Sequence, residues 1–125
     1  MARVALVVDD SMLIRHTVCR FLEERGFAVE SATNGIDALE ILHTVLPDVI
    51  ITDLVMPKMD GREFITRLKA HPETANIPIV LLVGRKTAND DQPEEQRADF
   101  TIYKDISILE QMMKGLKATI GETVQ

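Results

Sequence analysis

The 125-residue sequence has only one cysteine, no excess of positive charge and no long hydrophobic run. Because Cys19 has no second cysteine to pair with, the chain cannot form an internal disulfide. This favours a reducing compartment, and we expect Cys19 to fill space in a helix that packs on the core. A net charge of −6 argues against binding to duplex nucleic acid or to an anionic membrane, since both need clustered Lys and Arg.

The longest apolar run is too short to cross a bilayer, and a strand is predicted almost at the N-terminus, where a signal peptide would lie. We therefore expect a cytoplasmic protein. Hydrophobic residues make up 46% of the chain and charged residues 27%, which is typical of a globular domain. The sequence contains no repeat, low-complexity tract or linker, so we expect a single domain over residues 1–125.

Strand and helix periodicities alternate along the chain. Short apolar runs rich in β-branched residues predict strands at Val4–Val8, Phe27–Ala32, Val49–Thr52, Ile79–Val83 and Phe100–Tyr103. Apolar residues at helical spacing predict helices at Ser11–Glu24, at Ile36–Val45 with Asn34 as its cap, from Gly61 past Leu68, and from a capping box at Ser107 to about Ile120. This alternation predicts an α/β fold in which helices cover both faces of a parallel sheet.

The segment from Arg85 to Arg97 interrupts this pattern. Its only apolar residue apart from Pro93 is Ala88, and Pro93 lies in its middle. A helix without an apolar face gains little from packing, so we expect a degenerate helix of one short turn, or an irregular loop.

Acidic side chains follow two of the predicted strands at the point where each strand ends. Asp9 and Asp10 follow Val4–Val8, and Asp53 follows Val49–Thr52. If these strands are parallel neighbours, the carboxylates share one crevice, where their repulsion requires a cation or a shared proton. Oxygen ligands at a partly open site suit Mg²⁺, which also binds phosphate oxygens. An acidic surface loop is the alternative, but three acids at strand ends favour metal-assisted phosphate chemistry.

From Asp53 to Gly61 the sequence reads D-L-V-M-P-K-M-D-G, and Lys104 follows the last predicted strand. Together with the pair Asp9 and Asp10, this pattern resembles the receiver domains of response regulators in two-component signalling. The resemblance covers essentially the whole chain. It implies a flavodoxin-like, doubly wound α/β fold whose five parallel strands lie in the order 2-1-3-4-5.

The resemblance also implies a role for each site residue. Asp53 would accept a phosphoryl group from a histidine kinase or a phosphotransfer protein. Asp10, Asp53 and the backbone carbonyl of Val55 would bind Mg²⁺ directly, and Asp9 would act mainly through water. Lys104 would pair with the acids and then with phosphate, unless it is an ordinary surface lysine. Val55 lies where the family's side chain controls access of water; because it is apolar, we expect only slow self-dephosphorylation and no other enzymatic activity.

The sequence departs from the family pattern at three switch positions. Val83 replaces the Ser or Thr at the end of the fourth strand and cannot donate a hydrogen bond. Thr101 replaces the usual aromatic residue, although Tyr103 lies two residues later on the same face of the strand. Asp105 replaces the proline after the lysine, and we expect a trans peptide there because cis before a non-proline residue costs roughly 2.5–4 kcal/mol.

Gly84 and Arg85 follow Val83 next to the expected phosphate site. Arg85, with Lys86, could contact phosphate in place of the missing hydroxyl, or both could be solvated charges.

Two interpretations of function follow. In the first, the chain is a stand-alone receiver, with no room for an output domain, that acts on an unknown downstream protein when phosphorylated. In the second, it is a receiver-like scaffold that binds its partner independently of phosphorylation. A phosphohydrolase would need a second acid beside the nucleophile, where Leu54 and Val55 stand. A flavin-binding module would need a phosphate-cradling loop after the first strand, where the sequence is Asp-Asp-Ser.

Overall fold

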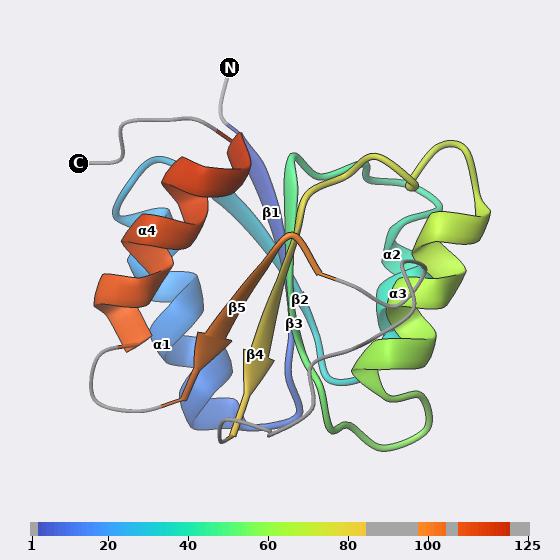
Figure 1. Ribbon diagram of the computed structural model, residues 1–125, viewed down its shortest axis with the longest axis horizontal. Coiled ribbons are helices and arrows are strands. Elements are labelled where there is room, and N and C mark those ends of the chain that lie inside the picture. Colours follow the sequence, from blue (N-terminus) through green and yellow to red (C-terminus); the bar gives the residue numbers. More distant parts are fainter. Residues whose placement is uncertain (1–2, 85–97, 105–107, 121–125) are drawn as a thin grey trace.

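The domain is a central sheet between two pairs of helices (Figure 1), seen in a computed structural model that describes residues 3–84, 98–104 and 108–120. The strands are β1 (Val4–Val8), β2 (Ala28–Ala32), β3 (Val49–Asp53), β4 (Ile79–Val83) and β5 (Phe100–Tyr103). The helices are α1 (Met12–Glu23), α2 (Gly35–Ile41), α3 (Gly61–Ala70) and α4 (Ile108–Ile120). Among these described residues, no helix is long and apolar enough to span a membrane.

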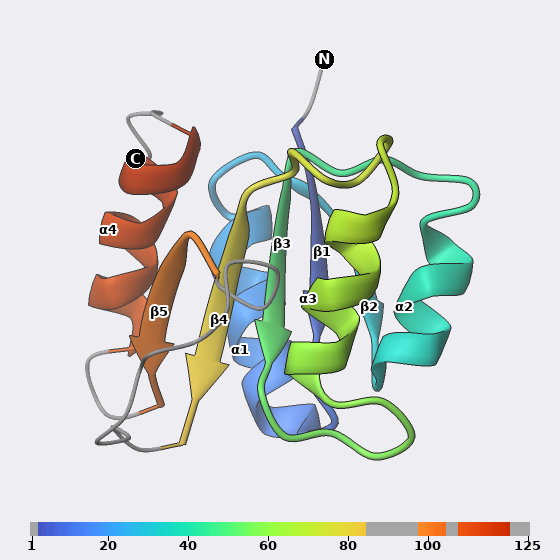
Figure 2. The same ribbon diagram turned by 45° about the vertical axis from the view of Figure 1, so that its right-hand side comes forward.

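All five strands are parallel and lie in the order β2-β1-β3-β4-β5, which confirms the predicted fold (Figure 2). The register places Val8 at the end of β1 opposite Thr52 in β3. The two strands that carry the acids are therefore direct neighbours, as the proposed crevice requires. Their carboxyl ends lie at one edge of the sheet, beside the loop that joins β3 to α3.

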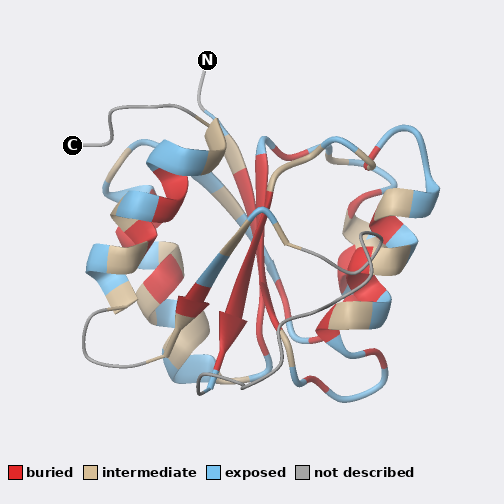
Figure 3. Ribbon diagram, in the orientation of Figure 1, coloured by how far each residue is buried: buried red, intermediate tan, exposed pale blue. Residues whose placement is uncertain are grey.

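Each face of the sheet has its own hydrophobic core. Helices α1 and α4 cover one face, and α2 and α3 cover the other (Figure 1). Side chains alternate between the faces, so Val7 packs with α1 and α4 whereas Leu6 packs with α2 and α3. Strands β3 and β4 are buried along their whole length (Figure 3), as expected for central strands of a covered parallel sheet. Cys19 is partly buried and packs at the edge of the first core.

Side-chain caps fix where three helices begin. The positions of these starts matter because the loops before them lie at the carboxyl ends of the strands, where the acids are. Ser11 caps α1 by accepting from the Ile14 amide, at 3.3 Å. Asn34 caps α2, as predicted, and Asp60 caps α3. Gly26 has a φ of 92°, a left-handed conformation that ends the turn after α1, also as predicted.

The helix predicted over Ile36–Val45 is shorter than expected, because α2 ends at Ile41. The residues after it form turns: the amides of Thr44 and Val45 both donate to the Ile41 carbonyl, and the Thr44 hydroxyl bonds to the same oxygen. A side-chain hydroxyl that competes for a helical carbonyl weakens the helix, and Pro47 follows. The degenerate helix over 85–97, the capping box at Ser107 and the peptide bond before Asp105 lie outside the described residues.

Candidate functional site

Three carboxylates meet at the carboxyl edge of β1 and β3. Asp9 and Asp10 follow β1 and Asp53 ends β3, and one oxygen from each lies within 4.8 Å of the others. Asp9 and Asp53 are buried, whereas Asp10 is exposed. The crevice predicted from the strand ends is therefore present, with two acids in its floor and one at its opening.

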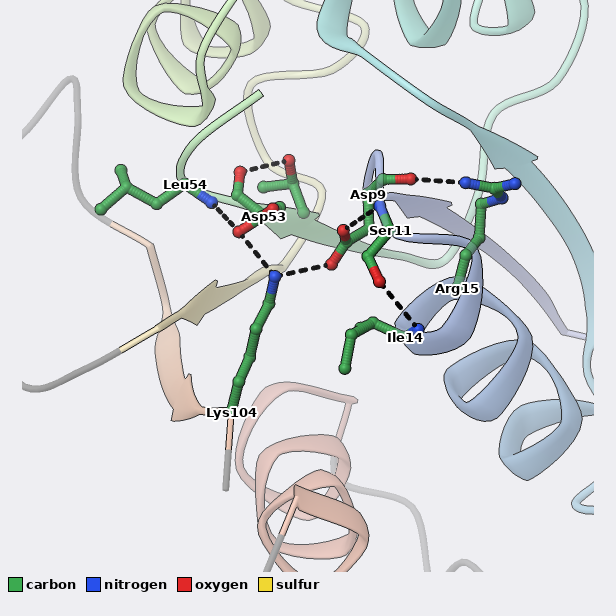
Figure 4. A network of polar contacts seen from close by, with 8 residues as sticks. Asp9, Ser11, Ile14, Arg15, Asp53, Leu54 and Lys104 are labelled. Carbon is green, nitrogen blue, oxygen red and sulfur yellow. Dashed lines mark hydrogen bonds and ion pairs between the residues drawn. The ribbon is translucent and has the colours of Figure 1, made fainter. Parts of the chain in front are cut away.

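Lys104 reaches this crevice from the end of β5, two strands away from β3 (Figure 4). Its Nζ atom lies 3.0 Å from Asp9 Oδ2 and 3.0 Å from Asp53 Oδ1. The lysine side chain is only 18% exposed, so these are shielded contacts rather than those of an ordinary surface lysine. The lysine is thus the internal counter-ion of the two buried carboxylates.

Burial and charge shift the pKa values of this cluster. Burial, reinforced by the Asp9 carboxylate, raises the pKa of Asp53 above its usual value, although contacts with Lys104 and the Leu54 amide oppose the shift. Burial alone would lower the pKa of Lys104, but the hydrogen bonds and charges of Asp9 and Asp53 outweigh it and raise that pKa. One ammonium does not neutralise three carboxylates, so the crevice keeps an affinity for further positive charge.

The backbone around the acid pair is held by contacts that the sequence pattern does not indicate. The Asp9 amide donates to the Ala32 carbonyl at 3.1 Å, and the Ser11 amide donates to Asp9 Oδ1 at 2.8 Å. Arg15 donates from Nη1 to the Asp9 carbonyl at 2.8 Å (Figure 4). These bonds fix the peptide between Asp9 and Asp10 and thereby the direction in which Asp10 leaves the backbone. Position offers one signal: Arg15 is one helical turn beyond the Ser11 cap, within reach of the strand end.

The Asp53 backbone is held from behind by a glycine. The Gly61 amide donates to the Leu54 carbonyl at 2.7 Å, and a Cβ atom at Gly61 would lie 2.3 Å from the Asp53 carbonyl oxygen. The start of α3 can approach Asp53 this closely only because residue 61 has no side chain. The Thr52 hydroxyl also donates to the Asp53 carbonyl, at 3.1 Å, and the sequence pattern indicates neither of these contacts.

Four of the other predicted site residues lie in the described part of the chain. Val55 is 75% exposed in the loop after β3. Val83 is buried at the end of β4, opposite Tyr103 in the register, and is followed by the exposed Gly84. Thr101 is exposed on β5. Arg85 and Asp105 lie outside the described residues.

The donor atoms suit a hard divalent cation. All three converging groups are carboxylates, and among the described residues the buried Asp9 Oδ2 has no hydrogen-bond donor apart from its ion pair with Lys104. Oxygen-only sites with one exposed carboxylate favour Mg²⁺, which binds through one or two carboxylates and keeps several waters. The acidic triad can therefore hold such a metal.

The sequence that carries this arrangement of acids and lysine matches a known protein family. Residues 5–117 match the response regulator receiver domain. The chain belongs to this family. Its acidic pocket of Asp9, Asp10 and Asp53 thus occurs in a receiver domain of two-component signalling.

The receiver domain is also similar to individual proteins. It is 36% identical over 86 residues to the response regulator Rre1 of Synechocystis, a match that covers 68% of this chain and 37% of Rre1. It is 34% identical over 89 residues to the sensor histidine kinase CheAY of Helicobacter pylori, covering 70% of this chain and 11% of CheAY. The chain thus spans well under half the length of these curated relatives.

Solved structures agree on the fold of the receiver domain. The chemotaxis response regulator CheY4 of Vibrio cholerae superposes with a TM-score of 0.86 at 30% identity, covering 95% of this chain and 99% of CheY4. The receiver domain of the sensor histidine kinase PA1611 of Pseudomonas aeruginosa has a TM-score of 0.86 at 20% identity and covers 98% of this chain and 100% of its own; its structure has magnesium in the active-site cleft.

Asp53→Asn is expected to stabilise the metal-free receiver domain at pH 7 by on the order of 1 kcal/mol. Because the pKa of Asp53 is raised on folding, the folded state binds this proton more tightly than the unfolded state does. Stability is therefore lost as pH rises from the ordinary aspartate value, about 3.9, through the raised one. Urea denaturation in EDTA from pH 4 to 8 should show the gain at pH 7 and little gain at pH 4. Glu30→Gln, at an exposed position, is the control; equal effects of both variants would contradict the prediction.

Proposed function

We propose that this receiver domain accepts a phosphoryl group on Asp53 from the phosphohistidine of a histidine kinase or phosphotransfer protein, with Mg²⁺, and acts by binding another protein. The observation that carries the proposal is the Asp53 carboxylate itself. It is buried beside Asp9 and Asp10 and contacts Lys104, where cations can balance the charge of an incoming phosphoryl group. Family membership supports the same class of reaction.

The contacts of Asp53 indicate which oxygen attacks. Among the described residues, the Leu54 amide at 2.8 Å and the Lys104 ammonium at 3.0 Å both contact Oδ1. This leaves Oδ2 as the nucleophile. An Oδ2–P bond forms as the P–N bond of the phosphohistidine breaks, and the electron pair of that bond returns to the imidazole nitrogen of the donor. Lys104 offsets part of the negative charge on the phosphoryl oxygens, which is the main obstacle to an anionic nucleophile.

Asp10, Asp53 and the backbone carbonyl of Val55 would hold the Mg²⁺ directly, and Asp9 would contact it through water. A bound divalent cation offsets the repulsion between carboxylate and phosphoryl oxygens. The magnesium reported in the cleft of the PA1611 receiver domain, which shares this fold, supports the assignment. The exposed position of Asp10 and its fixed backbone suit a ligand that must stay accessible to solvent and to the phosphodonor.

We further propose that residues 1–125 form one receiver domain whose output is a protein–protein contact. A specific observation favours a second candidate, a scaffold whose partner binding is independent of phosphorylation. Val83 is buried at the end of β4 and has no hydroxyl to offer a phosphoryl group, and Thr101 provides no aromatic ring on β5. Contact of Arg85 with phosphate and a trans peptide before Asp105 stay predictions.

Incubation with Mg²⁺ and acetyl phosphate tests the proposed transfer. Intact-mass measurement should find one added phosphoryl group on the wild-type protein and none on Asp53→Ala. Asp10→Asn should require far more Mg²⁺ for the same modification, and Glu30→Ala should behave as wild type. An unmodified wild-type protein, or a modified Asp53→Ala, would overturn the assignment of Asp53. Modification without any change in partner affinity would favour the scaffold.

Val55→Asn is expected to shorten the lifetime of phospho-Asp53 by severalfold. Val55 is 75% exposed and lies two residues after Asp53 in the chain. Its apolar side chain would shield the acyl phosphate without orienting a water molecule. An amide at this position can hydrogen-bond an attacking water. The measurement is the decay of the phosphorylated mass after the small phosphodonor is removed, with Val55→Leu as the apolar control. The same lifetime in all three proteins would remove this role.

A further inference from the structure

A side chain of helix α4, that of Gln111, bonds to both backbone polar groups of Tyr103 in the edge strand β5. The Tyr103 amide donates to Gln111 Oε1 at 2.9 Å, and Gln111 Nε2 donates to the Tyr103 carbonyl at 3.0 Å. These two groups face away from β4. Because β5 is the last strand of the sheet in the described part of the chain, no further strand pairs with them there. The Gln111 amide, which has one acceptor and two donors, takes the place of that strand.

The residue that follows this contact is Lys104. Its amide donates to the Val83 carbonyl at 2.9 Å, on the side of β4. The backbone of Tyr103 and Lys104 is thus held on both sides, by β4 and by Gln111. From this point the lysine side chain reaches Asp9 and Asp53 (Figure 4). The position of the ammonium therefore depends on this backbone segment. In the described part of the chain, the side of the segment that faces away from β4 is held by Gln111 of α4.

A second contact keeps α4 in register with β5. Gly115 lies one helical turn beyond Gln111, and a Cβ atom there would be 2.9 Å from the Phe100 ring, so the helix sits close against the start of the strand. Met112 and Leu116 are fully buried in the core beneath. The helix cannot slide along β5 without disturbing either Gly115 against Phe100 or Gln111 against Tyr103.

We infer that Gln111 is a positioning residue that holds Lys104 against the acidic site and couples the position of α4 to the occupancy of Asp53. The coupling rests on the proposed function. When a phosphoryl group is on Asp53, the ammonium of Lys104 gains phosphoryl oxygens as partners. If Lys104 moves toward them, the neighbouring Tyr103 backbone moves too, and its bonds to Gln111 transmit the movement to α4. Coupling of this kind is reciprocal, so a partner that moves α4 also changes the site. Val83 has no hydroxyl that could bond to a phosphoryl group. The contact between Gln111 and Tyr103 offers another connection between Asp53 and the surface of α4.

The positioning role can be tested without a phosphodonor. In Gln111→Met the volume is kept and both bonds are lost, whereas Gln111→Glu keeps an acceptor for the Tyr103 amide and loses the donor. The ¹⁵N and ¹H signals of the Lys104 ammonium, observed by NMR in the intact protein, should broaden through faster exchange with water and shift toward those of a solvated lysine in Gln111→Met, and change less in Gln111→Glu. Lys114→Met, at an exposed position of α4, should leave the signals unchanged.

The coupling is tested with Mg²⁺ and beryllofluoride, a mimic of the phosphoryl group. In the wild-type protein and in Lys114→Met we expect hydrogen exchange of the α4 amides to change by about tenfold on addition of the mimic, equivalent to roughly 1.4 kcal/mol. In Gln111→Met the change should fall to less than about twofold when the mimic is added at a concentration that saturates the Asp53 site. Gln111→Glu should lie between them and serves in place of Gln111→Met if that variant does not fold.

The outcomes separate the inference from the proposed function. If acetyl phosphate and beryllofluoride leave wild-type Asp53 unmodified, the proposed function fails and the coupling fails with it, while the ammonium signals still decide the positioning role. If Asp53 is modified but α4 does not respond in the wild type, or responds equally in Gln111→Met, the coupling is overturned. Unchanged ammonium signals in both Gln111 variants overturn the positioning role.

Discussion

Gly61→Ala is expected to destabilise the domain by roughly 3 kcal/mol and to reduce modification of Asp53 severely. The added methyl group would meet the Asp53 carbonyl oxygen at 2.3 Å and the Leu54 Cα at 2.9 Å. Both are backbone atoms and cannot rotate away as a flexible side chain would. Either the start of α3 or the end of β3 must therefore move, and the end of β3 carries Asp53.

Urea denaturation measures the loss of stability, and phosphoryl uptake from acetyl phosphate measures the loss of function. Gly84→Ala is the matched control for stability, because a Cβ atom there has no neighbour within 4 Å. Since Gly84 does not have a positive φ, its substitution should change stability by less than about 0.5 kcal/mol. If both alanine variants are equally stable, the close approach behind Asp53 has no energetic significance.

Lys104→Met is expected to destabilise the metal-free domain by about 3 kcal/mol at pH 7, and Mg²⁺ should restore much of this loss. The substitution leaves Asp9 and Asp53 buried together without their ammonium partner. Removing one member of a buried ion pair is costly because the remaining charge has lost its compensation. A divalent cation supplies positive charge to the same carboxylates, so the variant should gain more stability from Mg²⁺ than the wild type does.

Thermal denaturation of both proteins in EDTA and at increasing Mg²⁺ concentration tests this expectation. Lys117→Met removes an exposed lysine from α4 and should show the wild-type dependence on Mg²⁺. Because the pKa of Lys104 is raised on folding, its contribution is complete below the ordinary lysine value, about 10.4, and is lost as pH rises through the raised one. The difference between variant and wild type should accordingly shrink at strongly alkaline pH. An equal gain from Mg²⁺ in both proteins would show that the ammonium and the metal do not balance the same charges.

The order of the strands and the convergence of the acids could be predicted because both depend on features that the sequence expresses locally. Short β-branched runs alternate with helical spacing, and Asp9, Asp10 and Asp53 stand at the ends of two such runs. Parallel strands bring their carboxyl ends to one edge of the sheet, so the placement of these side chains followed from topology. The role of Lys104 was predicted from the resemblance to receiver domains. Its distances to Asp9 and Asp53 could not be predicted from the sequence.

The contacts that hold the site were not predictable to the same degree, because they join side chains to distant backbone groups. Arg15 bonds to a carbonyl, Gln111 bonds to Tyr103, and Gly61 matters through an atom that it lacks. Neither hydrophobic periodicity nor charge pattern records such pairings. The end of α2 at Ile41 was missed for a related reason, since Thr44 competes for a helical carbonyl that a pattern of apolar residues cannot register.

The salt bridges of Lys104 have a consequence for folding, because they join the first strand and the third to the last one. While the chain is being synthesised, β1 and β3 can pair long before residue 104 leaves the ribosome. Such an intermediate would bring the carboxylates together without their ammonium, and their mutual repulsion would disfavour it. Docking of the final strand therefore completes the sheet and also brings in the positive charge of Lys104. Without it, the assembled N-terminal half would be less stable, so the repulsion between the acids would make folding of the domain more cooperative.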